Sequence, residues 1–245
     1  MIVKSYNKKL IISGDIYEFY NYLEDVYYNH TVKVDPVGRS VEADNKQKIK
    51  NREKVLSRAR RDLRRLINAN VGRYGDCTAK FFTFTFAKNV QDLQVANNEW
   101  KKFIKRLNYR YKINSKYVVV VEFQKRGAIH YHAVFFNLPY IPVDDLAKVW
   151  RNGFVWVNKI DDVDNVGAYI CKYITKDSID DRLQGKKCYF SSRGLYKPVE
   201  LRDEKKIGEI LARLSPINIV YNVVFENEYN TIHYIQYNTK KLHSK

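Results

Sequence analysis

The sequence predicts an α+β fold, with a central antiparallel sheet and helices on its faces in the ferredoxin-like split βαβ arrangement. The first observation is that strand and helix periodicities follow one another from residue 80 in the order β-α-β-β-α-β-α. The second is the strand "KFFTFTFAKN". Phe82, Phe84 and Phe86 should lie on one face of this strand. Thr83 and Thr85 should lie on the opposite face.

The other core elements also have local signals. One helix is expected from apolar residues at helical spacing, which are Leu93, Ala96, Trp100, Phe103 and Leu107. The run "VVVVEFQKRGAIHYHAVFF", residues 118–136, indicates two strands joined by a tight turn. Pro142 lies in the first turn of a short helix, "PVDDLAKVW", and "FVWVNKI" is the next strand. Asp164 is expected to cap a last helix that runs to about Lys176.

The 245 residues are predicted to form one domain with additions to its core. The core is expected at about 76–180, with a basic helix at about 46–70 and a C-terminal β-hairpin extension at about 205–240. Residues 1–28 indicate a strand and a tyrosine-rich segment, and residues 30–45 a loop. The stretch "GKKCYFSSRGLYKP" is basic and loop-rich. No nucleotide-binding loop of the GxxxxGK[ST] type and no helicase module is recognisable.

The composition restricts the partner and the compartment. The chain has 44 Lys plus Arg against 27 Asp plus Glu, a net charge of +17, which favours a polyanion and most simply nucleic acid. A membrane surface competes, but the 20 tyrosines fit base stacking better. No apolar run approaches the roughly 20 residues that span a bilayer. There is no signal-peptide core and no CxxC pair, so we expect a cytoplasmic protein with free thiols.

The segment "KQKIKNREKVLSRARRDLRR" predicts an amphipathic helix with one basic face. It holds ten Lys or Arg and two Asp or Glu, so it alone carries +8. One interpretation is that the basic face is simply exposed to solvent. The functional interpretation is that it binds the nucleic-acid backbone. Together with the basic stretch after residue 185, the segment supplies the candidate DNA-binding residues, which are Arg58, Arg61, Arg65, Lys186, Lys187, Arg193 and Lys197.

Two histidines and a carboxylate stand in the apolar hairpin. His130 and His132 are two apart on a strand and therefore face the same side. A three-residue loop ending on Gly127 would pair Glu122 with His130 and bring all three groups onto one face. A two-residue loop would pair Glu122 with a tyrosine instead, and Gln124 or another residue would have to complete the set.

Two imidazoles and one carboxylate leave positions open on a divalent ion, as in catalytic rather than structural metal sites. The ligand types suit Mn²⁺ or Mg²⁺ in the cell and would also accept Co, Ni or Zn. The competing interpretation is a pair of half-exposed strand histidines, because an HxH pattern is weak evidence when it occurs alone.

A second pattern lies in "NVGAYICKYITKD". Tyr169 and Tyr173 are one helical turn apart, and each is followed at three residues by a lysine, Lys172 and Lys176. A tyrosine hydroxyl can attack a phosphodiester and form a covalent phosphotyrosine, and a nearby lysine can neutralise the phosphate. The competing interpretation is packing, because the chain has 20 tyrosines and the neighbouring helix face is apolar.

Taken in order, "FFTFTF", "HYH" and "YICKYITK" resemble the motifs of HUH-family rolling-circle replication initiators of plasmids and single-stranded DNA phages, in their two-tyrosine branch. The resemblance covers residues 80–178. It implies that His130 and His132 are the metal-binding pair and that Glu122 is a third ligand. It also implies that Tyr169 and Tyr173 are nucleophiles accompanied by Lys172 and Lys176.

The resemblance further implies an activity. Such proteins nick one strand at a single-stranded or hairpin origin with a metal-assisted phosphotyrosine intermediate and leave a 3′-OH for rolling-circle synthesis. They work in the cytoplasm of a bacterial host and depend on a host helicase and polymerase. A conjugative relaxase or a transposase of the same superfamily would have the same site. A non-catalytic nucleic-acid-binding protein is the alternative from a different functional class.

Overall fold

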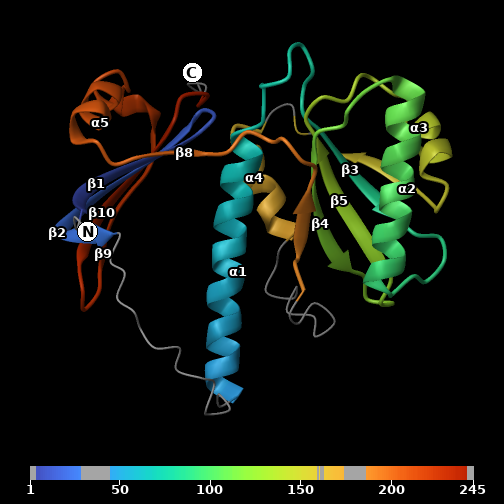
Figure 1. Ribbon diagram of the computed structural model, residues 1–245, viewed down its shortest axis with the longest axis horizontal. Coiled ribbons are helices and arrows are strands. Elements are labelled where there is room, and N and C mark those ends of the chain that lie inside the picture. Colours follow the sequence, from blue (N-terminus) through green and yellow to red (C-terminus); the bar gives the residue numbers. More distant parts are fainter. Residues whose placement is uncertain (1–3, 29–44, 159, 161–162, 174–185, 242–245) are drawn as a thin grey trace. The chain divides into compact units, whose positions relative to one another are not determined.

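The computed structural model describes residues 4–28, 45–158, 160, 163–173 and 186–241 (Figure 1). The chain divides into two compact units. Unit 1 comprises Met1–Arg58 and Pro198–Lys245, and unit 2 comprises Ala59–Lys197. The loop predicted at 30–45 lies almost wholly outside the described residues. The organisation of the whole chain as one nicking domain with extensions stays a prediction.

Unit 1 is built on a five-stranded antiparallel sheet with the strand order β8-β1-β2-β10-β9. Its strands are β1 (Lys4–Ser13), β2 (Ile16–Tyr28), β8 (Val199–Leu201), β9 (Ile219–Glu226) and β10 (Thr231–Asn238). The tyrosine-rich segment is strand β2. The predicted C-terminal hairpin is formed by β9 and β10, and β10 also pairs with β2. Helix α5 (Glu204–Leu211) buries Ile207 and is followed by a short 3-10 helix, η4 (Pro216–Asn218).

Unit 2 contains a second five-stranded antiparallel sheet with the order β6-β3-β5-β4-β7. Its strands are β3 (Lys80–Thr85), β4 (Tyr117–Phe123), β5 (Ile129–Phe135), β6 (Val155–Asn158) and β7 (Tyr189–Ser191). The helices are α2 (Leu93–Tyr111), α3 (Val143–Trp150), α4 (Val166–Ile170) and the 3-10 helix η1 (Cys171–Tyr173). The predicted order β-α-β-β-α-β-α is confirmed. β7 corrects the expectation of a loop after residue 185, because its backbone pairs with the free edge of β4.

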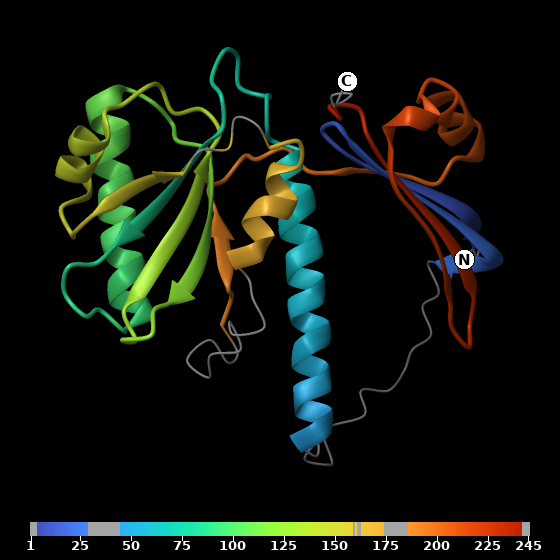
Figure 2. The same ribbon diagram turned by 180° about the vertical axis from the view of Figure 1, so that it is seen from behind.

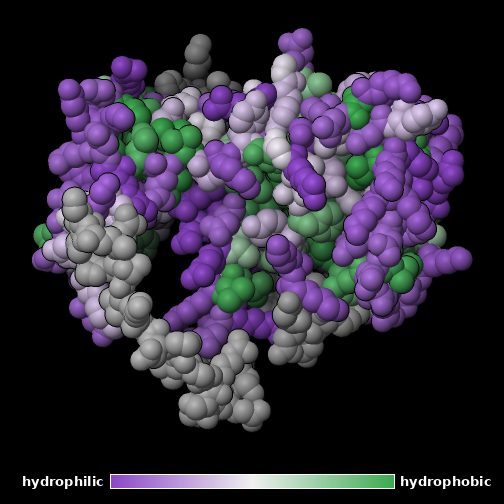
Figure 3. Space-filling model, viewed as in Figure 1, coloured by the Kyte–Doolittle hydropathy of each residue, from purple (hydrophilic) through white to green (hydrophobic). Residues whose placement is uncertain are grey.

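Helix α1 (Asn45–Asn68) is the predicted basic helix. Its C-terminal part buries Leu63 and Ile67, which lie one turn apart and form the apolar face of the helix there. Figures 1 and 2 show α4 between this part of α1 and the sheet of unit 2. No helix in the described ranges is long and apolar enough to cross a membrane. In agreement with the charged composition, hydrophilic side chains cover most of the face visible in Figure 3.

The two faces of the unit 2 sheet differ in chemistry. Helices α2 and α3 cover one face, where the ring of Phe84 lies 5.2 Å from Trp100, 5.0 Å from Phe103 and 5.3 Å from Trp150. This face holds the aromatic core. Strand alternation turns the odd-numbered residues of β3, including Thr83, and the histidines of β5 to the opposite face. The functional candidates therefore lie away from α2 and α3.

Candidate metal and nucleophile site

The loop of the β4–β5 hairpin sets which side chains share a face. It has three residues, closed by the Gln124 N–H donating to the Ala128 carbonyl at 2.8 Å. It ends on Gly127, whose φ of 88° lies in the region that favours glycine. Glu122 is consequently opposite His130 in the ladder. The three-residue alternative is confirmed, and the two-residue alternative is excluded.

Glu122, His130 and His132 form a group that can hold a metal ion. One ligand atom from each residue lies within 4.8 Å of the others. His132 is 4% exposed, and its Nε2 lies 2.5 Å from Glu122 Oε2. This hydrogen bond is the largest cause that lowers the pKa of Glu122, whereas burial opposes it. A carboxylate that stays ionised is the form that a divalent cation binds.

The environment of the His130 side chain is suited to a metal ligand. Its Nε2 is buried and has no hydrogen-bond partner within the described part of the chain. Burial, followed by the neighbouring His132, lowers the pKa of His130 to about 4. The imidazole is therefore neutral at pH 7 and has a free lone pair. A buried polar atom without a partner is costly, and a bound cation would satisfy it. On these grounds the three residues fit a divalent metal.

A second layer of side chains fixes the ring of His132. Its Nδ1 lies 3.1 Å from the Thr83 hydroxyl, which is opposite it on β3. The Asn158 side-chain amide on β6 donates to the same hydroxyl oxygen at 3.1 Å. Outer partners of this kind orient a ligating histidine and select its tautomer. Thr83 was predicted to lie on the face opposite Phe82 and Phe84 but without a role, and Asn158 was not predicted at the site.

Gln124 does not belong to this group. It lies at the base of the hairpin loop, and its side-chain oxygen accepts a hydrogen bond from Arg126 Nε at 2.9 Å. Because Glu122 is in register, the site needs no substitute ligand.

The two candidate nucleophiles lie over the same face of the sheet. The ring of Tyr173 stacks on His132 with centroids 4.1 Å apart and an interplanar angle of 26°. The ring centroid of Tyr169 lies 6.1 Å from that of Phe81 on β3 and 6.5 Å from that of Tyr173. Lys172 Nζ lies 5.1 Å from the centre of the Tyr169 ring. The structure thus brings Tyr173 to the metal-binding group and places Tyr169 beside Tyr173.

Lys176 and Ile174 lie outside the described residues. The predicted helix to about Lys176 can therefore be followed only to Tyr173, where α4 continues as η1. Burial is the largest cause that raises the pKa of Tyr173, followed by the charge of Tyr169 and a hydrogen bond with it. The phenol of Tyr173 is protonated at neutral pH.

The cap of α4 corrects one prediction. Asn165, not Asp164, is the N-cap, because its side-chain oxygen accepts from the Ala168 N–H at 2.9 Å. The same oxygen accepts from the Asn68 amide on α1 at 2.9 Å. Asn68 in turn accepts from the Gly167 N–H at 2.8 Å. Helix α1 therefore fixes the first turn of the helix that carries the tyrosines.

The predicted DNA-binding cations lie in several places. Arg58 belongs to unit 1 and Arg61 and Arg65 to unit 2, all on α1. Lys186 and Lys187 are exposed and precede Cys188, whose carbonyl accepts from the Val121 N–H next to Glu122. Arg193 and Lys197 are exposed beyond the opposite end of β7. Lys186 and Lys187 therefore directly precede the residue whose backbone bonds to the metal end of β4.

Two exposed aromatic side chains near the site were missed. Trp156 on β6 is opposite Thr83 and is 71% exposed. Phe154, two residues earlier on the same face, is 76% exposed. The alternation in "FVWVNKI" was recognised as a strand, but its register against β3 was not available from the sequence. Exposed rings of this kind can stack on the bases of a nucleic acid.

Comparison with family models identifies the segment that carries this site. Residues 79–178 match the model of the replication-associated protein family named for ORF2 and the phage gene II protein. The match covers this segment, which is less than half of the 245-residue chain, and we refer to the segment as the replication-associated domain. The family is one of phage rolling-circle replication initiators, and the resemblance to HUH initiators is thereby confirmed. Searches among curated proteins and among solved structures gave no match. The replication-associated domain contains Glu122, both site histidines and both tyrosines.

Proposed function

We propose that this chain nicks and rejoins one DNA strand at a replication origin through a phosphotyrosine intermediate, and leaves a 3′-OH for rolling-circle synthesis. The observation that carries the proposal is the stacking of Tyr173 on His132 within a replication-associated domain. A tyrosine held against a metal-binding group is the arrangement that tyrosine attack on a phosphodiester needs. The family match favours a replication role over a relaxase or a transposase.

The metal-binding role belongs to Glu122, His130 and His132. A divalent ion held by them, Mn²⁺ or Mg²⁺, would supply positive charge to the scissile phosphate. Their contribution is a carboxylate and two imidazoles on one strand pair, and the imidazole of His130 is neutral at pH 7. Thr83 and Asn158 keep the ring of His132 oriented. The chain therefore needs no rearrangement of its backbone to accept the ion.

In the proposed step, the phenolic oxygen of Tyr169 or Tyr173 attacks phosphorus. A tyrosine oxygen–phosphorus bond forms and the phosphorus–O3′ bond breaks. The phenolic proton leaves to solvent, and O3′ takes up a proton to give the free 3′-OH. One phosphoester replaces another, so no nucleotide triphosphate is consumed and the rejoining step is the reverse reaction. Lys172, and Lys176 in the same motif, would neutralise the phosphate during the attack.

We also propose a core topology and binding partners for this chain. The order β6-β3-β5-β4 and the helices that join β3 to β4 and β5 to β6 support a ferredoxin-like split βαβ core. The predicted cations, among them Lys186 and Lys187, would bind the DNA backbone, and Trp156 would stack on an unpaired base. A single-stranded or hairpin origin is the substrate class. A host helicase and polymerase would act on the nicked product.

The covalent intermediate provides the test. The protein is incubated with a single-stranded origin oligonucleotide and Mn²⁺, and adducts are separated under denaturing conditions and mapped by mass spectrometry. The single variants Tyr169→Phe and Tyr173→Phe show which tyrosine attacks first. Loss of the adduct identifies the replaced tyrosine as the first nucleophile, and an adduct on the remaining tyrosine shows that this residue can act alone. The double variant should form no adduct. EDTA should also abolish the adduct.

A control variant tests whether loss of the adduct is specific to Tyr169 and Tyr173. Tyr189→Phe removes a hydroxyl from the neighbouring strand β7 and should leave the adduct intact. An adduct that survives in the double variant would refute the tyrosine assignment. Binding of DNA that is unchanged in EDTA, without any strand cleavage by the wild type, would instead identify a non-catalytic nucleic-acid-binding protein.

A further inference from the structure

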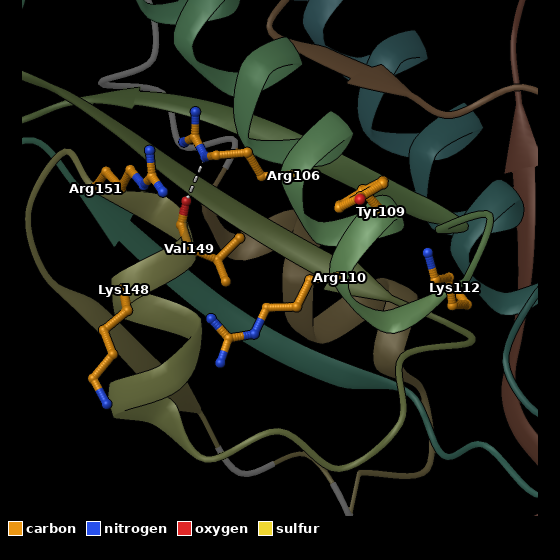
Figure 4. A pocket seen from close by; sticks show the side chains of 7 residues that line it. All are labelled: Arg106, Tyr109, Arg110, Lys112, Lys148, Val149 and Arg151. Atoms are coloured by element: carbon orange, nitrogen blue, oxygen red, sulfur yellow. Dashed lines mark hydrogen bonds between the residues drawn. The ribbon is translucent and has the colours of Figure 1, made fainter.

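A basic pocket lies on the far side of the unit 2 sheet. It has a volume of about 460 Å³ and is lined by residues from the ends of α2 and α3, which are Arg106, Tyr109, Arg110, Lys112, Lys148, Val149 and Arg151. Figure 4 shows Arg106, Arg110, Lys148 and Arg151 around Val149. Five of the seven lining residues are cations and none is acidic. Such a concave positive surface attracts a polyanion.

Two of the five cations interact with other groups of the protein. Arg106 donates from Nε to the Val149 carbonyl and from Nη2 to the Trp150 carbonyl, both at 2.9 Å, and so satisfies the C-terminal end of α3. Lys148 pairs with Asp145 at 2.9 Å. These two cations have structural partners, as is usual for positive side chains near a helix C-terminus.

The other three cations lie at the protein surface, and the charge of Arg110 also acts on the Asp145 carboxylate. Arg110, Lys112 and Arg151 are exposed and form no ion pair with any carboxylate in the described ranges. Burial, and then the charge of Arg151, lowers the pKa of Arg106. The cations thus repel one another within the pocket. An anionic ligand would relieve this repulsion.

The backbone at two of these residues is unusual. Lys112 has a φ of 52° and Arg151 a φ of 65°, and they are the two residues other than glycine with positive φ in the described part of the chain. Each is the C-cap of its helix, α2 and α3 respectively. A left-handed residue at a helix end is usually glycine, because a Cβ is unfavourable there. Here both positions hold a cation, and both cations line the same pocket.

We infer that this pocket binds phosphates of a DNA segment other than the one held at the tyrosines. Helices α2 and α3 and the metal-binding group lie on opposite faces of the sheet, so the scissile phosphate cannot reach both. Arginine side chains match the geometry of phosphate oxygens, and lysine adds a point charge. Tyr109 is 77% exposed beside Lys112 and offers a ring to an unpaired base. The inference rests on the proposed function in that DNA is the ligand.

The unusual backbone makes a selective test possible. The double variant Lys112→Gly/Arg151→Gly removes two cations at positions where glycine is the favoured residue, so the melting temperature should not fall. The control Lys101→Ala/Lys105→Ala removes the same charge from exposed positions of α2 outside the pocket. Binding of a labelled single strand of arbitrary sequence, long enough to reach the pocket, is measured in EDTA over a series of salt concentrations.

The pocket variant should bind this strand several-fold more weakly than the control. Its plot of log affinity against log salt should be shallower by about 1 to 2, for two lost phosphate contacts. Adduct formation with a short origin oligonucleotide should be unchanged. An equal loss in both variants, or no loss in either, would overturn the inference. Displacement of the strand by millimolar dATP from the wild type but not from the pocket variant would also overturn it, in favour of a free-nucleotide site.

The two proposals can fail separately. If the wild type forms no adduct, the nicking function fails, but the binding comparison in EDTA still decides whether the pocket holds DNA.

Discussion

Thr83 shows how much of this site depends on a residue that touches neither metal nor DNA. Its hydroxyl joins His132 on β5 to Asn158 on β6. When Nε2 of His132 binds a cation, the ring proton must sit on Nδ1, and the hydroxyl oxygen can accept it while it also accepts from the amide. Thr83 is therefore a positioning residue that favours the tautomer a metal requires.

Replacing this hydroxyl should weaken metal binding. Thr83→Val keeps the branched shape of the side chain and should lower Mn²⁺ affinity by about 10- to 100-fold, as measured by titration calorimetry. Thr83→Ser should restore most of the affinity. Thr85→Val is the control, because Thr85 lies opposite His130 on the same face but makes no side-chain hydrogen bond in the described part of the chain. Equal losses in both valine variants would show that Thr83 acts only through packing.

At the scale of elements, the basic helix α1 also positions helix α4. Its C-terminal turns hold α4 through Asn68, and the Cys171 thiol donates to the Arg60 carbonyl at 3.2 Å. Gly167 allows the close approach, because a Cβ there would lie 2.3 Å from the Arg64 carbonyl oxygen. The helix predicted only as a DNA-binding surface thus also positions the tyrosines over the metal-binding group.

This close approach leads to a test. Gly167→Ala should force α4 away from α1, destabilise the protein by about 1–3 kcal/mol and strongly reduce adduct formation. Mn²⁺ affinity should stay unchanged, because the metal-binding residues lie on β4 and β5. Gly208→Ala in α5 is the matched control, since a Cβ there meets open space and alanine is the better helix residue. The idea fails if both variants keep full adduct formation.

At the scale of the whole molecule, we expect the net charge of +17 to dominate the proposed association with DNA. Each cation that contacts a phosphate releases counterions from the DNA, so affinity falls as salt rises. The predicted cations on α1 and around β7, together with the pocket at the ends of α2 and α3, offer many such contacts. Specific recognition of an origin has to be added to this general attraction.

The salt dependence of binding can be stated in advance. With six or more phosphate contacts, affinity for single-stranded DNA in EDTA should drop by about 300-fold or more between about 50 and 200 mM salt. Fluorescence anisotropy of a labelled strand measures this directly. A nearly flat dependence would mean that the positive charge does not bind the DNA backbone and that stacking of aromatic side chains dominates.

The sequence by itself determined the local elements and the chemistry of the site. Alternating Phe and Thr in β3, the HxH pair in β5 and the glycine at the end of the hairpin loop follow from periodicity and backbone preference, which are properties of neighbouring residues. The sequence left the length of this loop open, and the structure decides it, because a three-residue loop places Glu122 opposite His130.

Only the tertiary structure decided what lies across strands and helices. Asn158 and Trp156 come beside Thr83 because β6 pairs with β3, and Tyr173 stacks on His132 because α1 holds α4 over the sheet. The strand β7 and the pocket at the ends of α2 and α3 have the same origin. Such contacts depend on strand order and helix packing, which bring together residues far apart in sequence, and local patterns carry no information about them.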